Sequence, residues 1–450
     1  MAERLNQAQK TLVRLLRNQL PSQAREVLKR LHAADLAELC LYLPRTEREM
    51  FVKLLIESDR AGTILSEVEE EVFSVIREYL DENKLVGILQ EMPTDDAADI
   101  INMLDEDERE RVFKKLTGTQ KRAIGQLLGY GEDTAGGVMT TEVHAFPADM
   151  TVADVIEELR HEEQKEVVLT IYIVSEHGHL VGVAPFRSLV FASPDQSVSE
   201  IMMKDPVHVN VEDSREDAAR LIAQYDLLSL PVVEENGKLE GVITVDDAID
   251  VMYDEATEDM FRLANLDAEE NVFSPVTRSI KLRLPWMIFN LITITCVAVT
   301  VNFFKGTLEK YIALAVLMPL IAGMSGNAGT QALTVVVRGL ALGEIDFKHG
   351  MRVLMKEIRV GLIAGCIIGI LMGMLSYAWF GNIYLGLIVL TAMVINLVLA
   401  CLFGSIIPIT LKKINLDPAL GSSMFVTMIA DIGGFAIFLG LATVFIRYLE

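Results

Sequence analysis

Five long apolar segments occupy the second part of this 450-residue chain and limit what it can fold into. A helix needs about 20 apolar residues to cross hydrocarbon about 30 Å thick, and each segment meets that length. The sequence therefore predicts five membrane-spanning helices, although a polar interruption at 326–331 leaves open two shorter pieces in the second. The segments run from about 284 to 304, 311 to 339, 353 to 379, 383 to 410 and 420 to 448.

The last apolar segment contains a carboxylate, Asp431, about ten residues from its start. A charged group in hydrocarbon costs several kcal/mol, so such a residue normally faces a water-filled path. Ser423, Thr427 and Asp431 follow at intervals of four and Gly434 comes three later, so they share one helical face. This stripe predicts an ion pathway. The alternative is a buried acid satisfied by neighbouring hydroxyls or by Asn396.

Other polar residues of the apolar segments have two interpretations each. Asn327 and Gln331 share a face of the second segment, where they line the path or join helices by hydrogen bonds. Glu357, near the start of the third segment, is flanked by Lys356 and Arg359. A structural ion pair and a role in transport are equally open for Glu357.

Charge is divided unevenly along the chain. Residues 1–275 hold 56 acidic and 27 basic residues, whereas residues 276–450 hold 7 and 13. An acidic soluble part therefore precedes the membrane part, and its surface repels nucleic acid and attracts divalent cations. The four cysteines lack metal-ligand or CxxC spacing. The absence of an HExxH motif, a Walker A loop or paired Cys and His argues against an enzyme.

Basic residues next to the apolar segments predict the orientation of the chain. Arg283 precedes the first span, Arg352 lies between the second and third, and Lys412 lies between the fourth and fifth. These segments share one side, which is predicted to be the cytosol. The first twenty residues contain no unbroken apolar core typical of a secretory signal. The N-terminus is therefore predicted to be cytoplasmic and the C-terminus to lie outside the cell membrane.

The first 130 residues are predicted to form an all-α domain, because apolar residues recur at intervals of three and four. A pattern at 35–49, beginning Asp-Leu-Ala-Glu, recurs 61 positions later at 96–110. Repeated helix pairs that bury one face against the next predict a small superhelix. Chance similarity between amphipathic helices is the alternative.

Residues 131–252 change to short β-rich runs separated by helices, in two similar halves at 131–200 and 201–252. The first half includes the run 167–174, and the second includes a Gly237 turn. Both halves resemble CBS domains, which implies one α/β regulatory module.

The CBS resemblance also implies a nucleotide site. In that family a Thr or Ser and an Asp three residues later often hold the ribose and phosphate of a nucleotide. Thr244 and Asp247 match this pattern, whereas the first half has Pro185 and Ser188. The resemblance therefore gives only weak support for ATP binding, and the residues that support it are Thr244 and Asp247.

Carboxylates accumulate where the second CBS half ends. Asp247, Asp250, Asp254 and Glu258 recur at three and four, so one helical face carries like charges that repel by tenths of a kcal/mol per pair. A solvated acidic helix is one interpretation. We favour metal binding, because the run leads into the membrane part through residues 253–280, which are predicted to form an acidic connecting helix.

Together these motifs resemble the MgtE family of magnesium transporters and channels along essentially the whole chain. CBS motifs alone are widespread, but their conjunction with the membrane motifs is specific. The residues that carry the resemblance are 135–140, 244–247, 255–259, 283–286, 326–331, Asp417-Pro418 and Asp431.

The resemblance implies a multidomain homodimer in the lipid of the cell membrane, with a pore domain of five spans at 281–450. Its function would be Mg²⁺ import, shut by cytosolic Mg²⁺ when the 253–280 helix plugs the pore. Mg²⁺ keeps several waters, so two Asp431 carboxylates need only attract a hydrated ion. The implied pore residues are Asp431, Ser423, Thr427, Gly434 and Asn327. The other implied Mg²⁺ positions are Asp95, Asp96, Asp99, Glu216, Asp226, Asp247, Asp250, Glu255, Glu258, Asp259 and Asp417.

Overall fold

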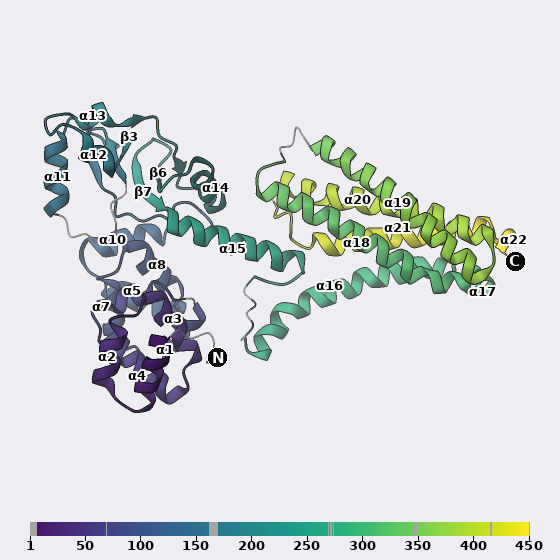
Figure 1. The fold of residues 1–450 in the computed structure, drawn as a ribbon, viewed down its shortest axis with the longest axis horizontal. Coiled ribbons are helices and arrows are strands. Elements are labelled where there is room, and N and C mark those ends of the chain that lie inside the picture. Colours follow the sequence, from purple (N-terminus) through teal and green to yellow (C-terminus); the bar gives the residue numbers. More distant parts are fainter. Residues whose placement is uncertain are drawn as a thin grey trace. The chain divides into compact units, whose positions relative to one another are not determined.

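The computed structural model describes residues 7–449 except 69, 162–169, 269, 271, 273, 346–349 and 415. The chain forms two compact units, Met1–Met252 and Tyr253–Glu450. The first unit is all-α up to Leu127 and then α/β, and the second is a bundle of long helices (Figure 1). Residues 167–169 of one predicted strand and the C-terminal residue Glu450 lie outside the described residues.

The N-terminal domain consists of short amphipathic helices whose apolar faces meet in one core. Phe51 and Phe73 are both fully buried there. Both copies of the repeated sequence pattern form two successive helices. The first copy forms α3–α4 and the second forms α8–α9. The helices are α1 (Gln7–Arg17), α2 (Pro21–Leu28), α3 (Ala33–Tyr42), α4 (Arg45–Ile56), α5 (Ala61–Leu65), α6 (Glu70–Arg77), α7 (Glu82–Leu89), α8 (Thr94–Asn102), α9 (Glu106–Lys115) and α10 (Gly118–Leu127).

Two small mixed sheets follow, one for each CBS half. One has the order β1-β2-β3-β4 and the other β5-β6-β7; the first strand of each is parallel to the second. The strands are β1 (Ala145–Pro147), β2 (Thr170–Val174), β3 (Leu180–Pro185), β4 (Met203–Lys204), β5 (Val209–Asn210), β6 (Ser229–Val233) and β7 (Leu239–Thr244). Their helices are α11 (Val152–His161), α12 (Phe186–Phe191), α13 (Val198–Ile201) and α14 (Arg215–Tyr225).

The two halves are interlocked. The chain that enters the second half supplies β4 to the first sheet, and Thr140, near the start of the first half, bridges to Val242 of β7. The Tyr172 hydroxyl and the Ser229 hydroxyl are hydrogen-bonded at 2.6 Å, which joins β2 to β6. The CBS pair is therefore one structural module, as its sequence resemblance implies.

The acidic connecting segment differs from the prediction of one helix at 253–280. Helix α15 begins earlier, within the second CBS half, and spans Val245–Leu263. Asn265 then adopts a left-handed conformation (φ 58°), which ends the helix. Helical structure resumes at Val276, after Pro275, with the first membrane helix.

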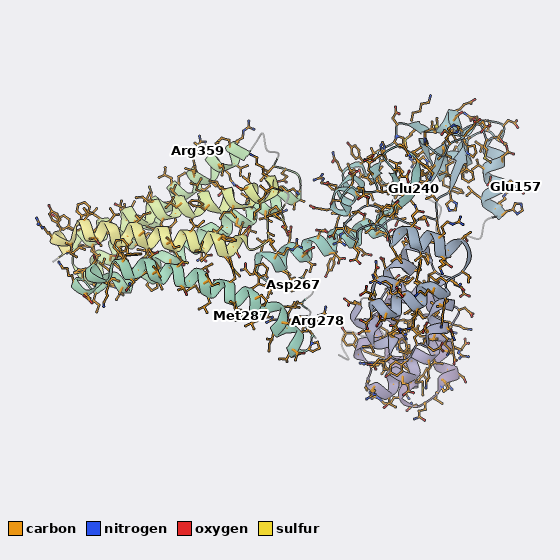
Figure 2. The ribbon with its side chains drawn as sticks, turned by 180° about the vertical axis from the view of Figure 1, so that it is seen from behind. Glu157, Glu240, Asp267, Arg278, Met287 and Arg359 are labelled. Carbon is orange, nitrogen blue, oxygen red and sulfur yellow. The ribbon has the colours of Figure 1, made fainter. Side chains whose placement is uncertain are left out.

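Among the described residues, five helices are long and apolar enough to cross a membrane. They are α16 (Val276–Phe303), α18 (Ala313–Ala341), α19 (Gly350–Phe380), α20 (Ile383–Lys413) and α21 (Ser422–Val444), with short α17 (Lys305–Lys310) and α22 (Ile446–Leu449). The 326–331 motif does not interrupt α18, so the second apolar segment is one span. Figure 1 shows α18 to α21 packed side by side, with α16 along one side. Arg278 and Met287, labelled in Figure 2, mark successive parts of α16.

Glycines allow the central helices to approach one another closely. A Cβ atom on Gly404 of α20 would lie 2.5 Å from the carbonyl oxygen of Gly329 in α18. Gly329 itself faces Val426 of α21, because a Cβ on Gly329 would lie 2.6 Å from Cγ1 of Val426. Helices α18 and α21, which carry the predicted pore residues, are therefore in close contact, and α20 meets α18 backbone to backbone.

We expect Gly404→Ala to destabilise the bundle, because the new methyl group would collide with a backbone carbonyl that cannot move alone. Overpacking of this kind costs about 1–3 kcal/mol. The Tm of the purified protein in detergent should fall by several degrees. Gly440→Ala is the matched control, since a Cβ at Gly440 meets nothing within 4 Å. Equal Tm values for the two variants would contradict this packing.

Candidate ion pathway and cation-sensing sites

The hydroxyl groups of the predicted polar face of α21 do not hydrogen-bond to Asp431. The Thr427 hydroxyl donates to the Ser423 backbone carbonyl at 2.9 Å, and the Ser423 hydroxyl donates to Oδ1 of Asn265 at 3.0 Å. Asp431 is half-buried, and its buried Oδ1 atom has no hydrogen-bond partner among the described residues. The alternative in which hydroxyls or Asn396 satisfy Asp431 is therefore not the arrangement found here.

Helix α18 presents a polar face on the surface of the single chain. Asn327, Thr330, Gln331 and Thr334 are exposed, whereas the opposite face of α18 is buried against α20 and α21. Polar side chains in a membrane helix normally face a bundle interior or a water-filled cavity rather than lipid. The predicted pore residue Asn327 thus lies on a face that needs water or a second protein surface.

Glu357 of α19 is an ion-paired residue. Its side chain is buried, and its carboxylate accepts a hydrogen bond from the exposed Lys356 ammonium at 2.7 Å. Of the two sequence interpretations for Glu357, the structure shows the structural ion pair.

At one end of the bundle, the last turn of α15 is held by a guanidinium that the sequence interpretation did not single out. Arg262 pairs with Glu258 one turn earlier and with Asp417, in the segment between α20 and α21. Leu263 packs against the apolar cluster that contains Leu333 and Val426. The i,i+4 spacing of Glu258 and Arg262 was the available signal, but the partner Asp417 is 155 residues away.

Three aspartates of the first unit lie close enough to repel one another. Burial raises the pKa of Asp95 in α8 above its usual range. Burial, followed by the charges of Asp95, Asp247 and Glu132, raises the pKa of Asp99 to about 7. Asp99 nevertheless keeps solvent contact, which screens part of this repulsion.

The third member, Asp247, lies in the first turn of α15. Burial raises its pKa to about 7, against the lowering effect of a hydrogen bond from the Thr244 hydroxyl, and Asp95 and Asp246 contribute repulsion. Oδ1 of Asp95 is buried without a hydrogen-bond partner among the described residues. A cation between α8 and α15 would relieve both the repulsion and this unpartnered oxygen.

The remaining predicted sensing residues are dispersed. Glu216 lies in the first turn of α14 and Asp226 follows its last turn, so about 15 Å of helix axis separates them. One ion cannot bind both within a subunit. Burial and the charge of Asp246 raise the pKa of exposed Asp250. In the part of the chain described, no three His, Cys, Asp or Glu side chains are arranged to hold a metal ion by themselves.

The predicted nucleotide residues are already engaged with each other. The Thr244 hydroxyl donates to Oδ2 of Asp247, and the same carboxylate faces Asp95 and Asp99. Pro185 in the first half ends β3 and precedes α12. The sequence assigns Asp247 to both a cation and a nucleotide, and its described neighbours are Thr244 and the carboxylates of Asp95 and Asp99.

A helical N-terminal domain, a CBS pair and an apolar helix bundle with an intramembrane carboxylate together define a multi-pass membrane transport protein. The family model for the MgtE divalent cation transporter domain matches residues 318–441. The MgtE intracellular N domain matches 31–133, and CBS domains match 135–195 and 198–254.

Similar proteins cover nearly the whole chain. The magnesium transporter MgtE of Bacillus subtilis is 32% identical over 97% of both chains, and that of Thermus thermophilus is 34% identical over 93% of this chain and 94% of the relative. A crystal structure of the cytosolic domain of the Mg²⁺ channel MgtE in complex with ATP covers 54% of this chain and 99% of that chain, with a TM-score of 0.51 and 35% identity. The chain belongs to the MgtE family.

Proposed function

We propose that this protein imports Mg²⁺ across the cell membrane and is shut by Mg²⁺ on the cytosolic side. The observation that carries the proposal is Asp431: a carboxylate inside an apolar helix, with an oxygen that no described side chain or backbone group satisfies. Such a group is stable in the membrane when a hydrated cation compensates it. The family membership and the magnesium transporters among its relatives support the choice of ion.

The functional unit in this proposal is a homodimer with the pore between subunits. The polar face of α18, which includes Asn327 and Gln331, is exposed on one chain and is unfavourable against lipid. A second copy would cover this face and bring a second Asp431 to the same path. Two carboxylates would attract Mg²⁺ while the ion keeps most of its water, which it gives up reluctantly.

The orientation places the acidic first unit in the cytosol and the C-terminus outside. The basic residues Arg283, Arg352 and Lys412 support it, because positive residues favour the cytoplasmic side of the membrane. An odd number of spans then puts the two ends on opposite sides.

Closure would use the carboxylates as a Mg²⁺ sensor. Cytosolic Mg²⁺ bound near Asp95, Asp99 and Asp247 removes their mutual repulsion and stabilises the closed arrangement, as a ligand stabilises the state it binds more tightly. Glu255, Glu258, Asp259 and Asp417 would take part where α15 approaches the bundle. An adenine nucleotide at Thr244 and Asp247 would compete with the cation for the same carboxylate.

The test is Mg²⁺ flux into vesicles that contain the reconstituted protein, with the cytosolic face accessible. Flux should fall as Mg²⁺ is added on the cytosolic side, and lowering the pH from 8 to 6 should raise the half-closing Mg²⁺ concentration about tenfold for each carboxyl that must lose its proton. The sign follows from the raised pKa values of about 7 for Asp99 and Asp247. Each carboxyl is mostly ionised at pH 8 and mostly protonated at pH 6, and a bound proton excludes the cation.

Asp99→Asn should weaken this pH dependence, because only Asp247 then titrates in this range, whereas Asp149→Asn, at an exposed acid, should leave it unchanged. Flux that ignores cytosolic Mg²⁺ at every pH would reject the sensor while leaving the pore assignment in place.

A further inference from the structure

Asn396, near the middle of α20, is a fully buried amide in the membrane bundle. Neither its Oδ1 nor its Nδ2 atom has a hydrogen-bond partner among the described residues. Other buried polar side chains of the bundle differ in this respect. The Ser325 and Ser405 hydroxyls each donate to a backbone carbonyl of their own helix at 3.0 and 2.9 Å.

The amide is directed at α21. A Cβ atom on Gly434 would lie 2.2 Å from Nδ2 of Asn396, so the amide occupies the space that a side chain at position 434 would fill. Gly433 lacks this contact, since a Cβ there would lie 3.5 Å from Leu399. Asn396 therefore touches the face of α21 that carries Gly434.

Asp431 lies on that same face, one turn before Gly434. Residues three apart on a helix are neighbours, with Cβ atoms about 5–6 Å apart. The buried Oδ1 of Asp431 and both polar atoms of Asn396 thus lie in one neighbourhood without a direct hydrogen bond among the described atoms. Polar groups that lie beyond direct hydrogen-bond distance can be bridged by one water molecule.

An unpartnered amide is costly in this place. Burying one without hydrogen bonds costs about 1–3 kcal/mol in proteins, and hydrocarbon offers no replacement. A buried water normally makes about three hydrogen bonds. Oδ1 and Nδ2 of Asn396 and Oδ1 of Asp431 supply that number of partners.

We propose that Asn396 is a positioning residue for Asp431. It holds the inner oxygen of the carboxylate through a shared water, and the other oxygen is left to face the passing cation. Asn396 itself does not contact the ion. The inference rests on the proposed pore role of Asp431 and adds a residue to it that lies on a different helix.

The test compares Asn396→Leu, which has similar bulk without polar atoms, with Asn396→Ser, which keeps a group that binds water. In reconstituted full-length protein, the leucine variant should raise the half-saturating Mg²⁺ concentration about tenfold with little change in maximal flux, because one hydrogen bond to a charged group is lost. The serine variant should remain near wild type. Ser405→Ala is the control, since its hydroxyl is already paired within α20.

A structural role would lower maximal flux and Tm in the leucine and serine variants alike, and this result would overturn the inference. In an Asp431→Asn background, Asn396→Leu should have no further effect on half-saturation; an undiminished effect would also overturn it. Asn396→Ala replaces the leucine variant in the same comparison if the latter does not assemble. If Asp431→Asn alone conducts normally, the proposed function fails, and that result is separate from the outcome at Asn396.

Discussion

Replacing Asp431 by asparagine is expected to lower Mg²⁺ flux about a hundredfold while the protein stays folded and assembled. A divalent ion about 5 Å from one carboxylate gains about 1.7 kcal/mol in water, and two carboxylates give about 3 kcal/mol. Losing this attraction reduces the occupancy of the path by roughly two orders of magnitude. Asparagine keeps the shape of the side chain, so packing around Gly434 and Asn396 should not change.

Flux of Mg²⁺ into vesicles, measured with a fluorescent indicator, checks this expectation. Glu309→Gln is a matched control, because it also removes one negative charge from the membrane unit, at an exposed residue that pairs with Lys305. Thr427→Val tests the stripe, and we expect a small effect because that hydroxyl donates to its own helix. Normal flux through Asp431→Asn in an assembled protein would remove the basis of the pore assignment.

The second large effect is expected at Arg262. Arg262→Gln leaves Glu258 and Asp417 close together without the guanidinium that pairs with both. Both ion pairs are partly buried. The stabilisation lost with them should therefore lie between that of an exposed pair and that of a buried pair, at about 1–2 kcal/mol. Without Mg²⁺ the last turn of α15 should therefore detach from the bundle about tenfold more often.

Limited proteolysis with chymotrypsin measures this detachment, with cleavage after Phe261 calibrated on an unfolded peptide of each sequence, because residue 262 follows the cut bond. The variant should be cut faster without Mg²⁺, and the half-protecting Mg²⁺ concentration should rise several-fold, since the ion must now compensate both carboxylates. The cleavage rate of Arg262→Lys, which keeps the charge, should lie between those of the wild type and Arg262→Gln. Lys305→Gln breaks an exposed pair elsewhere in the bundle and should not change cleavage near residue 260. Unchanged proteolysis in Arg262→Gln would show that the pair does not hold this segment.

Much of the architecture followed from local patterns. Five apolar segments became five helices because length and hydrophobicity alone decide whether a helix can cross a bilayer. The CBS halves were recognisable because their alternation of strand and helix repeats. The end of α15 was predicted wrongly, since helical spacing continues beyond Leu263 and the left-handed Asn265 leaves no periodic signal.

The candidate site also combines a residue that the sequence identified with a role that only the structure shows. Asp431 was identifiable from sequence because a carboxylate in an apolar segment is exceptional whatever surrounds it. The sequence named Asn396 only as a direct partner that could satisfy Asp431. The structure shows that its amide packs against Gly434 and has no hydrogen-bond partner among the described residues.

The sequence by itself determined the number of spans, the CBS pair and the intramembrane acid, because each depends on residues that are neighbours along the chain. Only the tertiary structure decided that Asp247 repels Asp95 and Asp99, and that Arg262 pairs with Asp417. Those relations join residues about 150 positions apart. Electrostatic and hydrogen-bond energies depend on separation in space, which spacing along the chain does not specify.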